Sequence, residues 1–241
     1  DGTRTLTIPA NFTYYSNGLR YTSSSLKSKQ ISTDLGLHYL YINGETLTET
    51  TTWSDNLITD YCIVAIIYWD GTKQIYYGAE YDHGYLMDSE THLYTHDTLG
   101  FALKSGGDLG DILVDENGTS NTHCEFSVSA TTAYDEDAKF EFTAKSSTTN
   151  IGVYYLLGSS AIWHIDESRS FPVINATTGD LRAVYNQNDG GTWKLTEVSN
   201  NDFLLAHIFT YNDITRKFGA IMGQNIYLNR TAARAGALTE I

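Results

Sequence analysis

The stretch IVAIIYWDG at residues 63–71 decides the fold. Its first seven residues are apolar, and Asp70-Gly71 separates them from a second run, Lys73–Tyr77. β-Branched and aromatic residues favour extended strands, and an Asp-Gly pair tolerates the positive φ angles of a tight hairpin turn. An uninterrupted apolar strand is typical of a sheet that is covered on both faces. This stretch therefore predicts a hairpin whose first strand is buried between two packed layers.

The same pattern of short β-prone runs separated by glycine turns recurs along the chain. Thr5–Ile8 and Lys139–Thr143 alternate polar and apolar residues, as half-buried strands do. Phe203–Phe209 is apolar except for His207, so we expect it to be covered on both faces like residues 63–69. The further turn signals are Asn17-Gly18, Asn43-Gly44, Asn117-Gly118 and Asp189-Gly190-Gly191.

These patterns predict an all-β chain, built as an antiparallel β-sandwich. Residues 1–104 would form an N-terminal β lobe and residues 105–241 a C-terminal β-sandwich lobe, because SGGDLG at 105–110 interrupts the strand pattern. One elongated domain would fit the same pattern. A short helix is expected over Ser89–Leu99, with Asp88 as its N-cap and Gly100 at its end. Thr231–Leu238, rich in Ala and Arg, is expected to begin another helix.

Composition excludes some classes of partner. The net charge of −14 repels nucleic-acid phosphates and anionic membrane surfaces, so we expect neither partner. No apolar run approaches the length of a membrane span. Cys62 and Cys124 both lie in apolar runs and are predicted to be small core residues, with a disulfide left open.

Three histidines near the predicted helix are the first candidate for chemistry. His92 and His96 would lie one turn apart on one helix face, a spacing that can chelate a divalent metal. His83 or Asp88 would supply a third ligand. Leu93 stands where a zinc protease would carry its glutamate base, so a structural metal is the cofactor to expect here rather than a catalytic one. Backbone hydrogen bonding is the commoner role for such imidazoles.

An acidic cluster, Asp135-Glu136-Asp137, is the second candidate. Clustered carboxylates can bind Ca²⁺ or act as a general acid and base. This cluster lacks the glycine and the spaced oxygen ligands of an EF-hand loop, and a solvated turn is its commoner role.

Tryptophans provide the third candidate, in Ile162-Trp163-His164 together with Trp193. Exposed Trp and Tyr side chains form platforms on which sugars stack, whereas buried Trp side chains fill a β core. The sequence carries no nucleophile elbow, no phosphate-binding or dinucleotide glycine motif, and no paired cysteines at zinc spacing. We therefore expect a protein without catalytic residues.

Several phrases, taken in order, resemble a known family. They are LGLHYLYI at 35–42, VAIIYWD at 64–70, His83-Gly84 followed by Met87-Asp88, Thr91-His92 and His96, YDED at 134–137, residues 201–209 and GQNIY at 223–227. Together they are similar to virion structural proteins of tailed bacteriophages and prophages, which are tail-fibre-like.

This resemblance implies a virion protein of the tail or fibre, in contact with other virion proteins and with a host-surface glycan or protein. It implies a homo-oligomer, for which a trimer is the expected form, and no catalysis. The chain departs from the family pattern at Glu80–His83, where more basic residues are expected before the His83-Gly84 pair. This departure weakens the case for an anion-binding or metal-binding role there.

Three other functions fit the same residues. A carbohydrate-binding module would present a row of exposed aromatic side chains, and a capsid or neck decoration protein would share the structural role without host contact. A glycan depolymerase, with Asp135, Glu136 or Asp137 among its carboxylates, would need two acids that face each other across a cleft.

Overall fold

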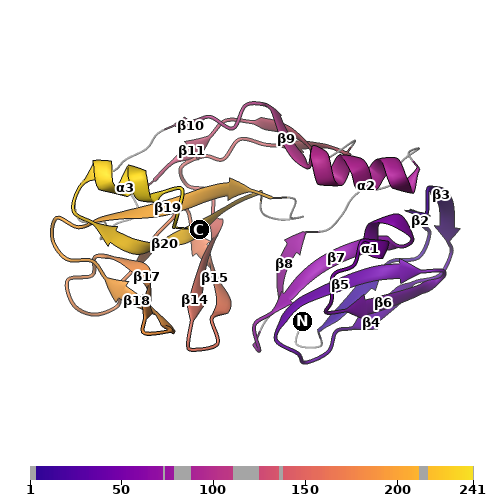
Figure 1. Ribbon diagram of the computed structural model, residues 1–241, viewed down its shortest axis with the longest axis horizontal. Coiled ribbons are helices and arrows are strands. Elements are labelled where there is room, and N and C mark those ends of the chain that lie inside the picture. The colour runs from indigo at the N-terminus through magenta and orange to yellow at the C-terminus, as the bar shows by residue number, and fades with distance from the viewer. Residues whose placement is uncertain are drawn as a thin grey trace. The chain divides into compact units, whose positions relative to one another are not determined.

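The computed structural model describes residues 4–72, 74–78, 88–110, 125–135, 138–211 and 217–240. The fold is all-β with short helices, as predicted, and its sheets are mainly antiparallel (Figure 1). The chain divides into two compact units. Unit 1 comprises residues 1–106, 131–142 and 212–214, and unit 2 comprises residues 107–130, 143–211 and 215–241. The chain thus leaves unit 1 after Gly106 and returns to it for Thr131–Phe142.

Unit 1 is built around a four-stranded sheet of order β6-β5-β7-β8. The predicted strand at 63–69 is β7, which pairs with β5 and β8 in the middle of this sheet. Its side chains alternate between buried and half-buried, so one face is covered fully and the other only in part. The strands of the sheet are β5 Gly36–Asn43, β6 Thr46–Thr50, β7 Cys62–Trp69 and β8 Gln74–Gly78.

Two hairpin-like pairs and a further small sheet complete the strands of unit 1. β1 (Thr5–Ile8) pairs with β4 (Lys27–Gln30), and β2 (Phe12–Ser16) pairs with β3 (Leu19–Ser23). Asn17 and Gly18, which join β2 to β3, have φ angles of 50° and 69°, as a type I′ turn requires. The small sheet has the order β13-β12-β9, with β9 Phe101–Ser105, β12 Thr131–Asp135 and β13 Ala138–Phe142.

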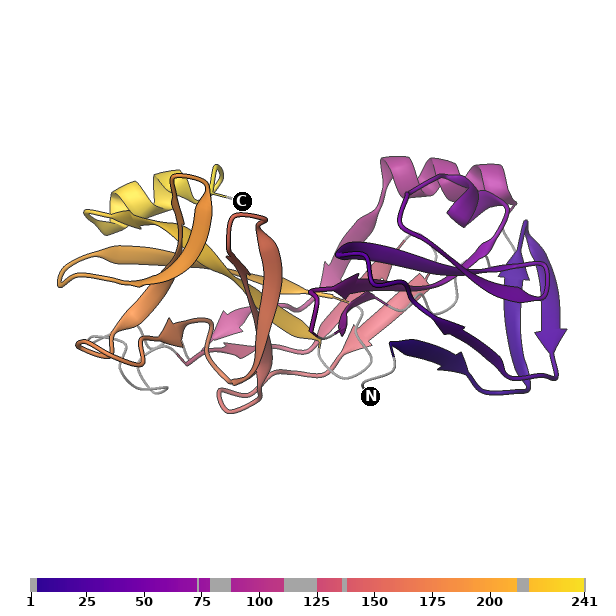
Figure 2. The ribbon, with the colours of Figure 1, turned by 90° about the horizontal axis from the view of Figure 1, so that it is seen from below.

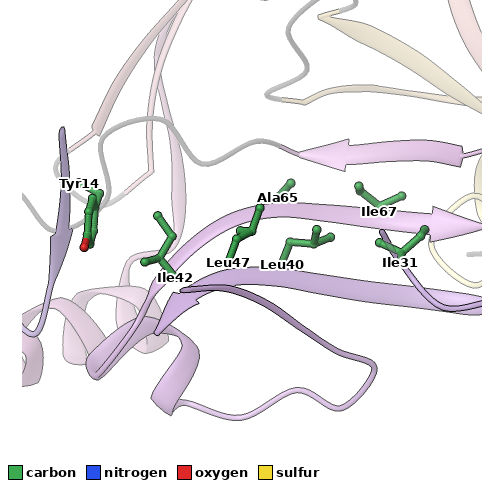
Figure 3. Close-up of a cluster of buried hydrophobic side chains, with 7 residues drawn as sticks. All are labelled: Tyr14, Ile31, Leu40, Ile42, Leu47, Ala65 and Ile67. Carbon is green, nitrogen blue, oxygen red and sulfur yellow. The ribbon is translucent and has the colours of Figure 1, made fainter. Parts of the chain in front are cut away.

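The main core of unit 1 lies between the four-stranded sheet and the β1–β4 and β2–β3 pairs. Figure 3 shows the buried side chains of this core, which come from β5, β6 and β7, from β2, and from Ile31 just after β4. Leu40 and Ile67 are fully buried, and Cys62 packs against the cluster, as its apolar surroundings predicted. The cluster consists of Tyr14, Ile31, Leu40, Ile42, Leu47, Ala65 and Ile67.

A contact between a buried histidine and a glutamate crosses the same sheet. His38 on β5 is fully buried, and its Nδ1 lies 2.6 Å from Oε1 of Glu49 on β6. Its Nε2 lies 2.9 Å from the backbone oxygen of Asp34, an atom that only accepts hydrogen bonds. Both ring nitrogens thus face oxygen atoms, and the imidazole is held from two sides. The pair ties β5 to β6 and to the chain that precedes β5.

The helices of unit 1 are α1 (Asn56–Thr59) and α2 (Ser89–Thr98), which pack against each other. The predicted helix is confirmed as α2, where the Asp88 carboxylate accepts a hydrogen bond from the Thr91 backbone N–H at 3.0 Å. Gly100 follows with φ +51°, the left-handed conformation that ends many helices. The sequence did not predict α1.

Unit 2 is built on a four-stranded sheet of order β15-β14-β20-β19, against which a smaller sheet β16-β17-β18 packs through β17 and β20. β14 and β20 pair in parallel, which departs from the predicted antiparallel pattern. The strands are β14 Ile151–Leu157, β15 Ile162–Arg169, β16 Ile174–Asn175, β17 Ala183–Asp189, β18 Thr192–Glu197, β19 Phe203–Thr210 and β20 Phe218–Tyr227.

Two short strands, β10 (Leu109–Gly110) and β11 (Ser127–Val128), pair beside these sheets, and α3 (Arg230–Gly236) packs on β19 and β20. Figure 2 shows α3, in yellow, alongside β19 and β20. β19 contains the predicted strand at 203–209, but it lies at the edge of its sheet and its apolar side chains are mostly half-buried. The expectation that it is covered on both faces is wrong, because Phe203 is exposed and the other side chains of β19 are only half-buried.

Candidate functional site

An open pocket of about 360 Å³ lies in unit 2, where the β17–β18 hairpin meets β20. Its side chains are two aromatic rings, four carboxamides and one aliphatic group: Tyr185, Gln187, Asn188, Trp193, Gln224, Asn225 and Ile226. All of these side chains are uncharged, so the lining offers hydrogen bonds and apolar contact without a net charge.

The hairpin half of the pocket is fixed by its turn. Gly190 and Gly191 join β17 to β18 with φ angles of 58° and 93°, and Asn188 stands opposite Trp193 in the register. The Gly191 N–H donates to Oδ1 of Asn188 at 2.8 Å, which closes the turn. Trp193 is held from its other side because its backbone exchanges two hydrogen bonds with Gly158. The turn residues thereby place Asn188 and Trp193 side by side at the pocket.

A bulge in β20 forms the other half. Leu204 pairs with Ile226 and Ala206 with Met222, so the four steps from Met222 to Ile226 face only two steps on β19. The extra residues interrupt the regular pairing of β19 with β20, and bulges of this kind can re-aim side chains. Gly223 starts the bulge directly over Leu205, where a Cβ atom would collide with the Leu205 backbone. Gln224, Asn225 and Ile226 are the bulge residues that reach the pocket.

The buried carboxylate of Glu240 holds this bulge from behind. Its Oε1 accepts hydrogen bonds from the backbone N–H groups of Gln224 at 3.0 Å and Asn225 at 2.8 Å, and from the Tyr227 hydroxyl at 3.3 Å. Its Oε2 lies 2.7 Å from Nε2 of His207 on β19. The side chain is 0% exposed, so the carboxylate satisfies N–H groups that the bulge would otherwise leave unpaired.

Tyr185 in the pocket lining and Tyr227, which contacts Glu240, are both held in their neutral form. Burial raises the pKa of Tyr185 above its ordinary value. Burial also raises the pKa of Tyr227, and the Glu240 charge raises it further. Both phenols therefore keep their protons at physiological pH, and the Tyr227 hydroxyl donates to Glu240.

The histidines of the predicted metal site have different surroundings. His92 is buried on α2, and His96 stacks on Trp53 with ring centroids 6.4 Å apart. Asp88 caps the helix, and hydrogen bonds from Thr91 lower the pKa of its carboxyl. In the part of the chain that the structure describes, no three His, Cys, Asp or Glu side chains are grouped to hold a metal ion. His83 lies outside that part, so the metal site at His83, His92 and His96 stays a prediction.

The acidic cluster is described only in part. Asp135 ends β12 and pairs with Ala138 of β13, while Glu136 and Asp137 lie outside the described residues. The role of these three carboxylates therefore stays a prediction. Cys124 and the Asn117-Gly118 turn also lie outside the described residues.

Of the two tryptophans predicted as candidates, the fold places only one at the pocket. Trp193 lines the pocket, whereas Trp163 lies half-buried on β15 opposite Leu156 and is not part of the lining. His164 stacks on Tyr155 at a centroid distance of 5.7 Å. Sequence reasoning missed the pocket residues Gln187 and Gln224, because isolated amide side chains carry no pattern. It also missed Glu240, whose partners are at least thirteen positions away along the chain.

No protein-family model, curated protein or solved structure matches this chain. Among the helices that the structure describes, none has the length and apolar character needed to cross a membrane.

Proposed function

We propose that the chain is a non-catalytic structural protein of a tailed-bacteriophage particle, located in the tail or fibre apparatus, where it assembles with further copies of itself and takes part in host attachment. The resemblance of its sequence phrases to virion proteins motivates this proposal. One structural observation supports it: an exposed apolar patch in unit 1, formed by Phe101 and Leu103 on β9 and by Leu99 just before this strand, which we call the β9 edge.

The β9 edge is apolar where a solvent-exposed strand is usually polar. Leu99, Phe101 and Leu103 are 67%, 50% and 62% exposed. Phe101 and Leu103 point to the same face of β9 because side chains alternate along a strand. Large apolar side chains that gather on a surface mark sites of protein contact.

The backbone of β9 also favours pairing. β9 hydrogen-bonds to β12 on one side and is the last strand of its sheet among the described residues. An edge strand presents unpaired N–H and C=O groups to which another strand can add. A second copy of this chain is the occupant we propose, since the family resemblance implies a homo-oligomer, with a trimer as the expected form. Other virion proteins would contact the assembled oligomer.

Measurement of molar mass by light scattering after size-exclusion chromatography tests the assembly. We expect the wild-type chain to be oligomeric, and the double variant Phe101→Ser/Leu103→Ser to shift toward the monomer because it removes the exposed apolar surface. Leu26→Ser is the matched control, since Leu26 is 57% exposed but lies away from β9. A wild-type chain that is monomeric at all concentrations would contradict the assembly.

Immunogold labelling of purified particles from a phage that encodes the chain tests the location. Gold at the tail or fibre is the expected result. Label confined to the capsid or neck would instead favour a decoration protein, and unlabelled particles would refute a virion role.

A further inference from the structure

We infer that the pocket of unit 2 binds a neutral carbohydrate of one or two sugar rings. The biological meaning of this binding rests on the proposed role in host attachment, which it would make specific by naming the class of receptor. The binding itself rests on residues of unit 2 alone.

The hydrogen-bonding groups of the pocket suit hydroxyl groups. A carboxamide offers both a donor and an acceptor, as does each sugar hydroxyl, so the two pair in either direction. Within the described part of the chain, the Gln224 side-chain amide makes no hydrogen bond. Gln187 accepts one at Oε1 from the Thr196 hydroxyl, at 2.8 Å, and this bond does not use its amide nitrogen. The pocket therefore holds amide groups with hydrogen-bonding capacity to spare.

The apolar part of the pocket suits the C–H face of a sugar ring. Trp193 is half-buried and Ile226 is 43% exposed, and both contribute to the lining. An aromatic ring that is held rigidly offers a flat apolar surface at low entropic cost, next to amides that bind the ring's polar edge. The volume of about 360 Å³ lies near the lower end of the range for small-molecule sites, which limits the ligand to one or two rings.

Charge selects against ionic ligands. Among the residues that the structure describes, no Lys or Arg lines the pocket to neutralise an acidic sugar or a phosphate, and no carboxylate lines it to bind a cation. The nearest lysine along β18, Lys194, is already paired with Asp189 at 2.6 Å. The net charge of −14 also repels anions at long range. The uncharged, amide-rich lining therefore favours a neutral, hydroxyl-rich molecule.

The bulge is organised before any ligand binds. Glu240 fixes the backbone of Gln224 and Asn225 through two hydrogen bonds, and Gly223 sets the close approach to Leu205. Because these contacts do not involve the side chain of Gln224, that side chain can bind a ligand without breaking them. A backbone ordered in advance reduces the entropy lost on binding.

Saturation-transfer NMR and isothermal titration calorimetry with the full chain test this inference. The probes are neutral mono- and disaccharides of glucose, galactose, mannose, rhamnose and N-acetylglucosamine, with sialic acid and glucuronic acid as charged probes. We expect at least one neutral probe to bind and the charged probes to bind more weakly. Gln224→Ala should lower the affinity for that neutral probe about tenfold, the effect of losing one to two hydrogen bonds.

Asn200→Ala is the matched control, because it removes an exposed amide of unit 2 that is not part of the pocket lining. It should leave the affinity unchanged. Absence of binding to every neutral probe, preference for a charged probe, or equal affinity of wild type and Gln224→Ala would each overturn the inference. None of these results would alter the oligomeric state, so the failure of this inference is distinguishable from failure of the proposed assembly.

Discussion

Lys145 is a charged residue whose ammonium group is buried in the interior of unit 2, where it loses hydration. It is 1% exposed, and its ammonium group donates to the backbone oxygens of Phe126 and Ser146 at 2.9 Å each. The same group lies 4.1 Å from the centroid of the Phe126 ring. Burial lowers the pKa of Lys145 from its ordinary value of 10.5 to about 8. The three contacts thus compensate only part of the lost hydration.

This shift predicts a pH dependence of stability. Between about pH 8 and pH 10 the unfolded Lys145 still holds its proton while the folded one has released it, so the unfolding free energy should rise with pH. The rise from Lys145 should reach about 2 kcal/mol across this window. Urea denaturation at pH 8, 9 and 10 measures it, and Lys145→Met should remove this part of the slope.

Lys194→Met is the control for this measurement, since the Lys194 side chain is 48% exposed in the same unit. It should keep the wild-type slope. A slope that is identical in wild type and Lys145→Met would show that another group titrates. The window ends near pH 10 because the raised pKa values of Tyr14, Tyr185 and Tyr227 reverse the sign above it: the unfolded tyrosines lose their protons first.

At the scale of single elements, β20 combines a regular strand with a bulge that depends on one glycine. Gly223→Ala should destabilise the protein by about 1–3 kcal/mol, because the new methyl group would collide with backbone atoms of Leu205, which cannot rotate away. Urea denaturation measures the loss, and hydrogen exchange should report faster exchange at the Gln224 and Asn225 amides. Gln224→Ala, which adds no clash, should retain wild-type stability. Unchanged exchange at these amides in Gly223→Ala would refute the steric argument.

Local elements were predictable where short-range chemistry determines them. Asn17-Gly18 and Gly190-Gly191 adopt the positive φ angles that their sequences favour, and the hairpins around them form as predicted. The α2 helix begins at its predicted cap, Asp88. In each case the deciding interaction spans only a few residues, so the sequence pattern is sufficient.

Long-range pairings were not predictable in the same way. β14 and β20 are parallel neighbours although more than sixty residues separate Tyr154 from its partner Ile221. The bulge in β20 depends on Glu240, whose contact with His207 joins residues 33 positions apart. Among the residues that line the pocket, only Trp193 was a candidate from the sequence, because a single tryptophan can form a sugar-stacking surface by itself. Gln187 and Gln224 form a binding surface only when the fold brings them together.

At the scale of the whole molecule, each unit has a core of its own. Leu40 in unit 1 and Val153 in unit 2 are both 0% exposed. Leu40→Ala should cost about 2–5 kcal/mol through the cavity it leaves. We expect hydrogen exchange to show the loss of protection in β5, β6 and β7, with the amides of β17–β20 unchanged. Val153→Ala should show the reverse distribution, and equal loss in both units would mean that they unfold as one.

The route of the chain between the units constrains how the gene can evolve. β12 and β13 complete the sheet of β9. In the sequence, however, residues 107–130, which belong to unit 2, lie between β9 and β12. A recombination event with one breakpoint after codon 106 would graft a foreign sequence in place of β9's own partner strands. Exchange of either unit between genomes therefore requires several coordinated breakpoints. We expect homologous genes to be inherited with the coding regions of both units together.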